Sequence, residues 1–303
     1  VNGQKGPASI SVRQPYFSWM FGDAVNDALT TPAFSWYSCG GGAGNMPRDV
    51  AVGDVTGDGR PDVVVANYYS QNYVMVNNGG LPNTWTTLPL PNAGGNVSHV
   101  VRVADMTGDG RPDIVFGEYA RASFILVNTG GSPDAWPRIP LSVSSQLWAM
   151  EIGDLTGDGR PDIVVGNEYY MGAQNYVLVN TGGRPDSWPS YPLGSYLADC
   201  TRGLAIGDVN GDGRLDVVVG NMANSGSAQH YVLLNNGGLP NTWARTRLGN
   251  TNTVGTGNVS IGDVTGDGRP DITASINESG LDQNFVWVNN GGSPDTWTRI
   301  RPG

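Results

Sequence analysis

The sequence is poor in residues that favour helices and rich in residues that form turns. It contains four glutamates and a single lysine, Lys5, against 45 glycines and 20 prolines. Such a composition disfavours long helices and favours many short strands joined by turns. No apolar run reaches the roughly 18 residues of a membrane-spanning helix, and no signal-type apolar stretch follows Val1. We therefore expect a globular chain without membrane insertion.

Cysteine and basic residues are also scarce. Cys39 and Cys200 are the two cysteines, so the fold cannot depend on a disulfide framework, although one bridge between them stays open. The formal charge is -10 and the arginines are dispersed, which argues against a nucleic-acid partner. The acidity needs another explanation.

An internal repeat dominates the chain. DVTGDGRPD begins at Asp54 and recurs as DMTGDGRPD from Asp105, DLTGDGRPD from Asp154, DVNGDGRLD from Asp208 and DVTGDGRPD from Asp263. A second motif follows each copy at a fixed place and ends at a tryptophan: Trp85, Trp136, Trp188, Trp243 and Trp297. Five copies at a period of about 50 residues indicate a repeat architecture.

Each repeat predicts four strands. An alternating pair such as Val50 and Val52 precedes the acidic loop, and a valine-rich segment, an NYVMVN-like segment and the residues after the tryptophan follow it. Four short strands per unit without helices are typical of a β-propeller blade. We therefore predict an all-β fold, a β-propeller of four-stranded antiparallel blades forming a single domain over residues 1–303. A two-sheet sandwich and a β-solenoid are the alternatives.

The number of blades is less well defined than the blade itself. Residues 46–303 hold five full repeats, and residues 1–45 resemble a sixth, degenerate blade, with SISVRQPY, FSWMFGD and FSWYS as its last three strands. This segment lacks an obvious first strand and acidic loop. Six blades are expected, with five or seven as alternatives.

The acidic loop has the donor pattern of a calcium site. Oxygen-bearing side chains occupy loop positions 1, 3, 5 and 9, position 7 offers a carbonyl, and glycine at position 6 permits a sharp turn. The absence of nitrogen and sulfur ligands argues against zinc or copper. An EF-hand would need glutamate at position 12, where the chain has Val65, Phe116, Val165, Val219 and Ala274. A phosphate-binding glycine loop would not present three carboxylates, and a metal-free aspartate turn remains the plain alternative.

The pattern D-x-[TN]-G-D-G-R-[PL]-D between two strands resembles the FG-GAP or VCBS repeat of integrin alpha-chain propellers and many secreted microbial proteins. The resemblance covers residues 46–303 and implies about five calcium ions bound by a secreted protein. Threonine at position 3 in four copies departs from the aspartate or asparagine of stronger binders. The implied ligands are Asp54, Thr56, Asp58, Arg60, Asp62, Asp105, Thr107, Asp109, Arg111, Asp113, Asp154, Thr156, Asp158, Arg160, Asp162, Asp208, Asn210, Asp212, Arg214, Asp216, Asp263, Thr265, Asp267, Arg269 and Asp271.

Chain direction predicts where a ligand would bind. The first strand enters the acidic loop and the second leaves it, so the start of the first and the end of the second meet on the opposite face. That face varies between repeats and is polar and aromatic, which suits a sugar. The candidates are Arg48, Asn67, Tyr68, His99, Glu118, Tyr119, Trp148, Asn167, Glu168, Tyr169, Arg202, Asn221, Asn277 and Glu278, with Tyr69 and Tyr170 beside them. The repeated tryptophans are expected to pack between sheets instead.

Three functions fit these features. A secreted, lectin-like propeller would bind a glycan or polysaccharide without turnover, and repetition would raise its avidity. A glycoside hydrolase or polysaccharide lyase would use Glu118, Glu168 or Glu278 as acid and base. An adhesion module would bind a protein partner. The two histidines, His99 and His230, and the lack of a nucleophile elbow favour binding over catalysis.

Overall fold

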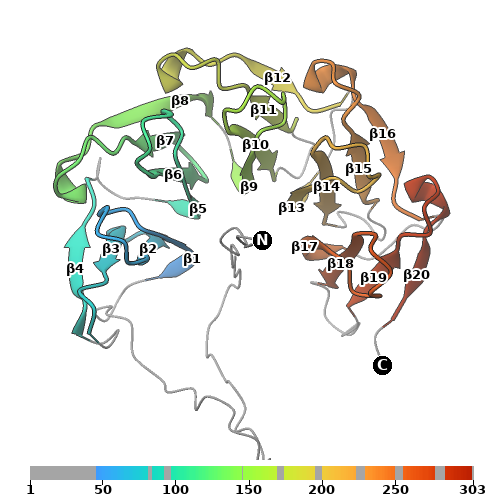
Figure 1. Cartoon of the computed structure of the whole chain (residues 1–303), viewed down its shortest axis with the longest axis horizontal. Coiled ribbons are helices and arrows are strands. Elements are labelled where there is room, and N and C mark those ends of the chain that lie inside the picture. The colour runs from blue at the N-terminus through green and yellow to red at the C-terminus, as the bar shows by residue number, and fades with distance from the viewer. Residues whose placement is uncertain are drawn as a thin grey trace, which may run out of the picture.

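The computed structural model describes residues 46–80, 84–91, 97–144, 146–168, 174–194, 200–222, 229–249, 255–276 and 284–301. These residues form five four-stranded antiparallel sheets, here called blades 1 to 5. The sheets follow one another around a common centre, with the first strand of each innermost (Figure 1). The predicted all-β propeller is confirmed, whereas the predicted degenerate blade lies outside the described residues.

Within each blade the strands pair in chain order. Blade 1 comprises β1 (Pro47–Gly53), β2 (Asp62–Asn67), β3 (Tyr73–Val76) and β4 (Thr86–Pro89). Blade 2 comprises β5 (Ser98–Ala104), β6 (Asp113–Glu118), β7 (Ala122–Leu126) and β8 (Arg138–Ser144). Blade 3 comprises β9 (Leu147–Gly153), β10 (Asp162–Asn167), β11 (Tyr176–Leu178) and β12 (Ser190–Pro192). Blade 4 comprises β13 (Thr201–Gly207), β14 (Asp216–Asn221), β15 (Tyr231–Leu234) and β16 (Ala244–Arg247), and blade 5 comprises β17 (Thr256–Gly262), β18 (Asp271–Ile276), β19 (Phe285–Val288) and β20 (Thr298–Ile300).

Short 3-10 turns precede the outer strands of blades 2 to 5. They are η2 (Pro133–Ala135), η3 (Pro185–Ser187), η4 (Pro240–Thr242) and η5 (Pro294–Thr296), each opened by its proline. Proline suits the first helical position because its fixed φ matches and its missing N–H is not needed there. Each turn ends at the repeated tryptophan, and the outer strand of the blade follows.

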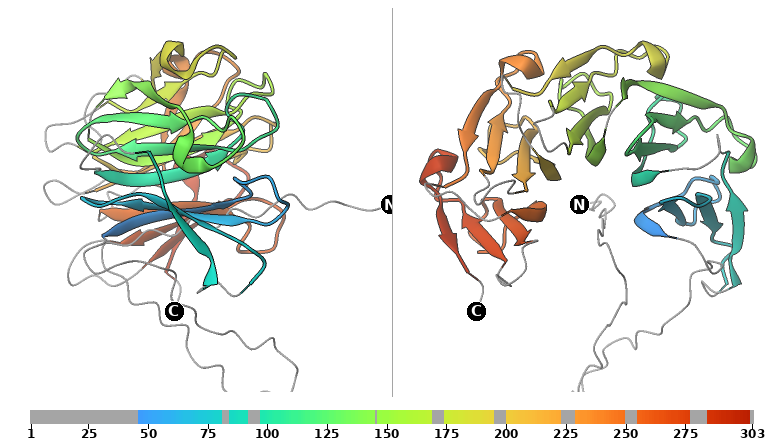
Figure 2. Two further views of the ribbon diagram at one scale, coloured as in Figure 1. Left: turned by 90° about the vertical axis from the view of Figure 1, so that its left-hand side faces the viewer. Right: turned by 180° about the vertical axis from the view of Figure 1, so that it is seen from behind.

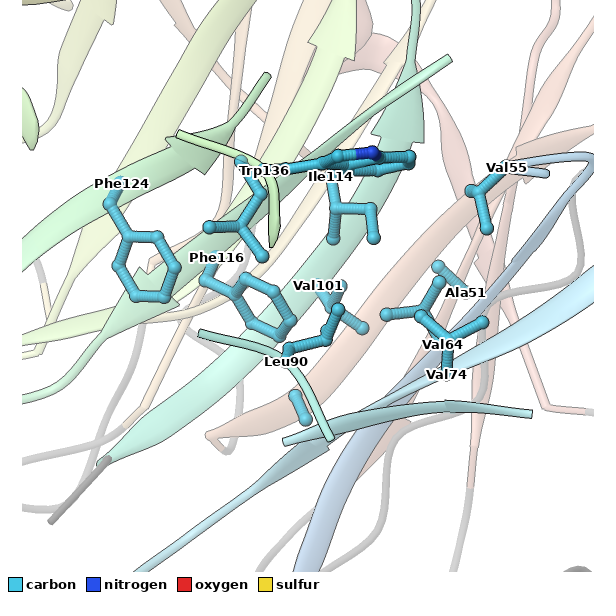
Figure 3. Packing of buried hydrophobic residues seen from close by; sticks show 12 residues of the cluster. Ala51, Val55, Val64, Val74, Leu90, Val101, Ile114, Phe116, Phe124 and Trp136 are labelled. Carbon is cyan, nitrogen blue, oxygen red and sulfur yellow. The ribbon is translucent and has the colours of Figure 1, made fainter. Parts of the chain in front are cut away.

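The hydrophobic core lies between blades rather than within them. The second strand of blade 3, β10, is buried along its whole length because it has a neighbouring blade on each face. Between blades 1 and 2, Val64 and Val74 meet Ile114, Phe116 and Trp136 (Figure 3). Similar clusters fill the next three interfaces. The repeated tryptophans of blades 2 to 5 are buried in them, so the predicted packing role is confirmed for Trp136, Trp188, Trp243 and Trp297.

The inner strands of the first three blades are joined by a charge network. The guanidinium of Arg102 on β5 pairs with Asp49 of β1 at 2.7 Å and with Glu151 of β9 at 2.6 Å. Asp49 also accepts the Val101 N–H at 3.0 Å, which otherwise faces the unpaired inner edge of the sheet. The network therefore fixes three neighbouring blades to one another.

The five blades form an arc rather than a closed ring. In both the front view and the view from behind, an opening separates blade 1 from blade 5 (Figures 1 and 2). None of the helices in the described part of the chain has the length and hydropathy needed to span a membrane.

Candidate functional site

Five aspartate loops connect the first and second strands of the blades. In the first loop, residues 54–62, Gly57 and Gly59 have φ of 76° and 84°, and nothing lies within 4 Å of an added Cβ at either position. The positive φ confirms that position 6 makes a sharp turn that only glycine adopts freely. The other four loops repeat this conformation.

The first aspartate of each loop organises the turn. Asp54 Oδ1 accepts the N–H groups of Gly57 and Asp58 at 2.7 and 3.1 Å, and Oδ2 accepts that of Gly59 at 2.8 Å. The same three bonds recur in every copy. This carboxylate therefore holds the loop in its turn through backbone amides.

The ninth aspartate is fully buried and joins the loop to the rest of its blade. Asp113 Oδ2 accepts the N–H groups of Met106 and Thr107 at 2.9 and 3.1 Å, and Oδ1 accepts that of Asn128 at 2.7 Å. Burial raises the pKa of Asp113, against the effect of these amides. For the equivalent Asp216, burial raises the pKa to about 6.

The fifth aspartate pairs with the arginine at position 7. Asp58 accepts the backbone N–H of Arg60 at 2.9 Å and forms an ion pair with its guanidinium, while Arg60 Nε donates to Asn77 O at 2.7 Å. All five loops share this ion pair. The loops contain 15 of the 27 acidic and five of the 17 basic residues, so they carry the whole formal charge of -10.

The loop chemistry suits a hard cation, because every donor is an oxygen. In the described arrangement, however, no three carboxylate, histidine or cysteine side chains converge as a metal-binding group. The fifth aspartate faces arginine and the ninth faces backbone amides. Threonine at position 3 also turns inward in the first loop, where Thr56 Oγ1 donates to Asp62 at 3.1 Å.

The opposite face carries the second candidate site, and a β-bulge shapes it in every blade. The register between first and second strands shifts at the second residue of each first strand. A bulge leaves one extra residue unpaired and redirects its side chain. The five bulged residues are Arg48, His99, Trp148, Arg202 and Gly257.

The bulged residues contact the residues that follow the second strands. In blades 1 to 3 this residue contacts the bulged residue of the next blade: the Tyr68 ring lies 5.1 Å from His99, Tyr119 lies 6.0 Å from Trp148, and Glu168 pairs with Arg202. Backbone bonds such as Tyr68 N to Met46 O, 2.8 Å, join the end of the second strand to the start of the first, so these two chain ends meet as chain direction predicts. We call this set, completed by Tyr69, the rim: Arg48, Tyr68, Tyr69, His99, Tyr119, Trp148, Glu168 and Arg202.

Stacking and cation contacts run continuously along the rim. The Arg48 guanidinium lies 4.8 Å from the Tyr68 centroid, His99 stacks on Tyr119 at 4.9 Å, and Arg202 lies 3.8 Å over Trp148. One ring face of Trp148 is thus covered by Arg202, which leaves less of this indole for a ligand than the sequence suggests.

Glu168 is the acidic residue of the rim, and 6% of its surface is exposed. One of its oxygens pairs with Arg202, and Oε2 has no hydrogen-bond donor among the described residues. Burial raises the pKa of Glu168, while the neighbouring Arg202 opposes that rise.

Tyr69 is the exposed and strained member of the rim. Its φ is 62°, the left-handed region that bulky residues rarely adopt, and 67% of its surface is exposed. The Tyr68 hydroxyl donates to the Tyr69 hydroxyl at 3.1 Å, and this bond is the main cause that raises the pKa of Tyr68 to about 12. Backbone strain of this kind is often found at functional sites.

Four other candidates lie inside the blades. Asn67, Asn167 and Asn221 are buried and donate to the carbonyls of Gln71, Gln174 and Gln229, while Glu118 accepts from Ser98 Oγ and from Val97 N at 3.1 Å. Their bonds hold the turns under the rim, so we assign them a positioning role. Tyr169, Asn277 and Glu278 lie outside the described residues.

Sequence patterns did not reveal the bulges or the network around Arg102. A signal was present for the bulges, because the five residues occupy one position relative to the acidic loops. The partners of Arg102 carry no such signal, since Asp49 and Glu151 lie at different positions of their repeats.

The family model for the FG-GAP-like repeat matches residues 54–116, 105–165, 154–219 and 208–274. No curated protein matches the chain.

Solved structures support the fold at low identity. The N-terminal domain of BBS1, in complex with ARL6, is 11% identical with a TM-score of 0.52, covering 80% of this chain and 66% of that one. The Dos1 propeller is 10% identical with a TM-score of 0.51, covering 80% and 56%. Dihydro-heme d1 dehydrogenase NirN is 17% identical with a TM-score of 0.52, covering 85% and 48%. The chain spans 38% to 66% of the length of the solved structures that it resembles.

Proposed function

The chain belongs to the FG-GAP-like repeat family, and on that premise we propose that it is a secreted, calcium-binding propeller that binds carbohydrate at the rim. The observation that carries the binding site is the bulge at the same position of every blade. A constant backbone device presents different side chains, four of them large and aromatic or cationic. Variable residues on a constant scaffold are typical of binding surfaces.

The chemistry of the rim favours a sugar as the ligand. A pyranose presents an apolar face to aromatic rings and hydroxyls to polar groups. Tyr69 offers an exposed ring, and Glu168 Oε2 is a buried acceptor that no donor among the described residues satisfies. Arg48 and Arg202 add hydrogen-bond donors on either side.

Calcium would be held at the aspartate loops, on the other face. Asp54, Asp58 and Asp62, with the Arg60 carbonyl and Thr56, are the donors in the first loop, and the same positions serve in the others. Calcium supplies a fixed positive charge that neutralises the carboxylates. The fit requires the fifth aspartate to exchange its arginine partner for the ion. Because threonine at position 3 weakens the donor set, we expect sites of the modest affinity typical of extracellular modules.

A glycan array in calcium buffer, followed by calorimetry with the best ligand, tests the rim. Tyr69→Ala should weaken binding by about three- to tenfold, the range of one lost aromatic contact. Tyr191→Ala is the matched control, because Tyr191 is partly exposed on the outer strand of blade 3. Equal affinities of the two variants would place the site elsewhere.

The same experiments distinguish a lectin from an enzyme and from a protein-binding module. Release of reducing ends or unsaturated uronates from a bound polysaccharide would show an enzyme instead of a lectin. Silence on the array would contradict carbohydrate binding and turn attention to a protein partner.

A further inference from the structure

Every interface between described blades is built in the same way. The apolar residue at loop position 2 of one blade packs against the repeated tryptophan of the next, as Val55 does with Trp136. An asparagine of the later blade also donates its side-chain amide to the carbonyl of that apolar residue. The four bonds are Asn128 to Val55 at 3.0 Å, Asn180 to Met106 at 2.8 Å, Asn235 to Leu155 at 2.8 Å and Asn289 to Val209 at 2.9 Å.

The end blades carry the two unmatched halves of such an interface. Val264, the position-2 residue of blade 5, is 57% exposed, whereas its four counterparts are 1% to 3% exposed. On blade 1, Trp85 is only partly buried and packs with a small cluster around Val65, Tyr73 and Met75. Val52 on the same face is 54% exposed.

Among the described residues, the asparagine hydrogen bond that joins the other neighbouring blades is not formed between blades 5 and 1. Asn77 of blade 1 occupies the place of the bridging asparagines, and its amide donates to Pro61 O at 3.1 Å within its own blade. Among the described residues, no carbonyl of blade 5 accepts from it. The five blades therefore do not close as a five-membered ring, and something must cover both faces.

The nearest candidate is the part of the chain that leads directly into β1. It has 45 residues, against repeat spacings of 49 to 55. Residues 22–28 read GDAVNDA, which keeps the glycine and the first and fifth aspartates of GDVTGDG at 53–59. Asparagine at position 4 tolerates positive φ, whereas Ala28 replaces the glycine of position 6, so the turn of this unit departs from the other five there. Ala24 falls at the position of Val55. This alignment places FSWMFG in a first strand, in contrast to the third strand predicted when residues 1–45 are laid over the last three strands of the repeat.

We propose that residues 1–45 fill the opening between blades 5 and 1, with Ala24 against Trp85 and the other side of the segment over Val264. A tethered segment acts at high effective concentration, which favours it over a second copy of the chain. Leu29 replaces the loop arginine and Thr31 the buried aspartate, so this unit lacks the charges of the other five loops. The proposal concerns ring closure and is independent of the sugar and calcium proposals.

The test uses the full chain with Val264→Asp. If the segment covers Val264, the introduced carboxylate is buried and the melting temperature should fall by about 5 °C or more. Leu239→Asp is the matched control, because Leu239 is 49% exposed on blade 4, which has a neighbour on each side; its effect should stay below about 2 °C. Ala24→Arg should reproduce the loss, and Ala28→Arg should not.

Three results would overturn the proposal. Equal small effects of Val264→Asp and Leu239→Asp would mean that the face is bare in solution. A dimeric mass by light scattering that Val264→Asp converts to a monomer would assign the faces to a second copy. A harmless Ala24→Arg beside a damaging Val264→Asp would assign them to a different segment.

Discussion

Replacing the ninth aspartate should destabilise the protein with or without calcium. In Asp113→Asn the amide presents one acceptor and one donor where the carboxylate presents two acceptors, so either the Asn128 N–H or the N–H groups of Met106 and Thr107 lose their acceptor. Each buried N–H left without a partner costs about 1–3 kcal/mol, which gives about 1–3 kcal/mol for Asn128 alone and about 2–6 kcal/mol for the pair. For a chain of this size the melting temperature should fall by about 2–9 °C.

The fifth aspartate of the same loop provides the control. Asp109 is part-exposed and pairs with Arg111, and an exposed ion pair contributes about 0–1 kcal/mol. Asp109→Asn should therefore leave the melting temperature in EDTA almost unchanged. In calcium buffer it should reduce the added stability, because that loop would lose an ion ligand.

Thermal unfolding followed by circular dichroism, in EDTA and in calcium, measures both variants. The reasoning fails if Asp113→Asn behaves like Asp109→Asn in EDTA. The ninth aspartate would then serve a bound ion alone, and its three backbone hydrogen bonds would contribute little to the fold.

Four further outcomes are expected. EDTA should lower the melting temperature of the unaltered protein, because an ion bound only to the folded state stabilises it by mass action; an unchanged melting temperature in EDTA would contradict calcium binding. Asp58→Ala should lower the melting temperature less than the same change made in all five loops. Arg102→Met should lower the free energy of unfolding in urea by about 2–4 kcal/mol, since it leaves Asp49 and Glu151 in a partly buried site without their shared cation. In EDTA, Asp216 should make the stability of the fold decrease as pH rises from about 4 through about 6, because its pKa is higher in the folded state than in the unfolded chain. Melting temperatures measured across this pH range should show the decrease. In Asp216→Asn the decrease should be smaller.

Much of the blade was predictable because each unit repeats the same local signals. The alternating valines, the Gly-Asp-Gly turn and the Pro-x-x-Trp segment each act within a few residues, and five copies average out the ambiguity of one. The candidate sites were predictable in part. The face followed from chain direction, but burial of Asn67 and Glu118 did not, because their partners come from turns and from the neighbouring strand.

By itself the sequence determined the repeating unit, the order of its strands, and which end of each blade carries the carboxylates. Tertiary structure decided what arises where blades meet: the reach of Arg102 across three blades, the cover of Arg202 over Trp148, and the two unmatched end faces. The physical reason is that local propensities act along one strand or turn. Contacts between blades depend on packing among residues about 30 to 80 positions apart, which no single repeat records.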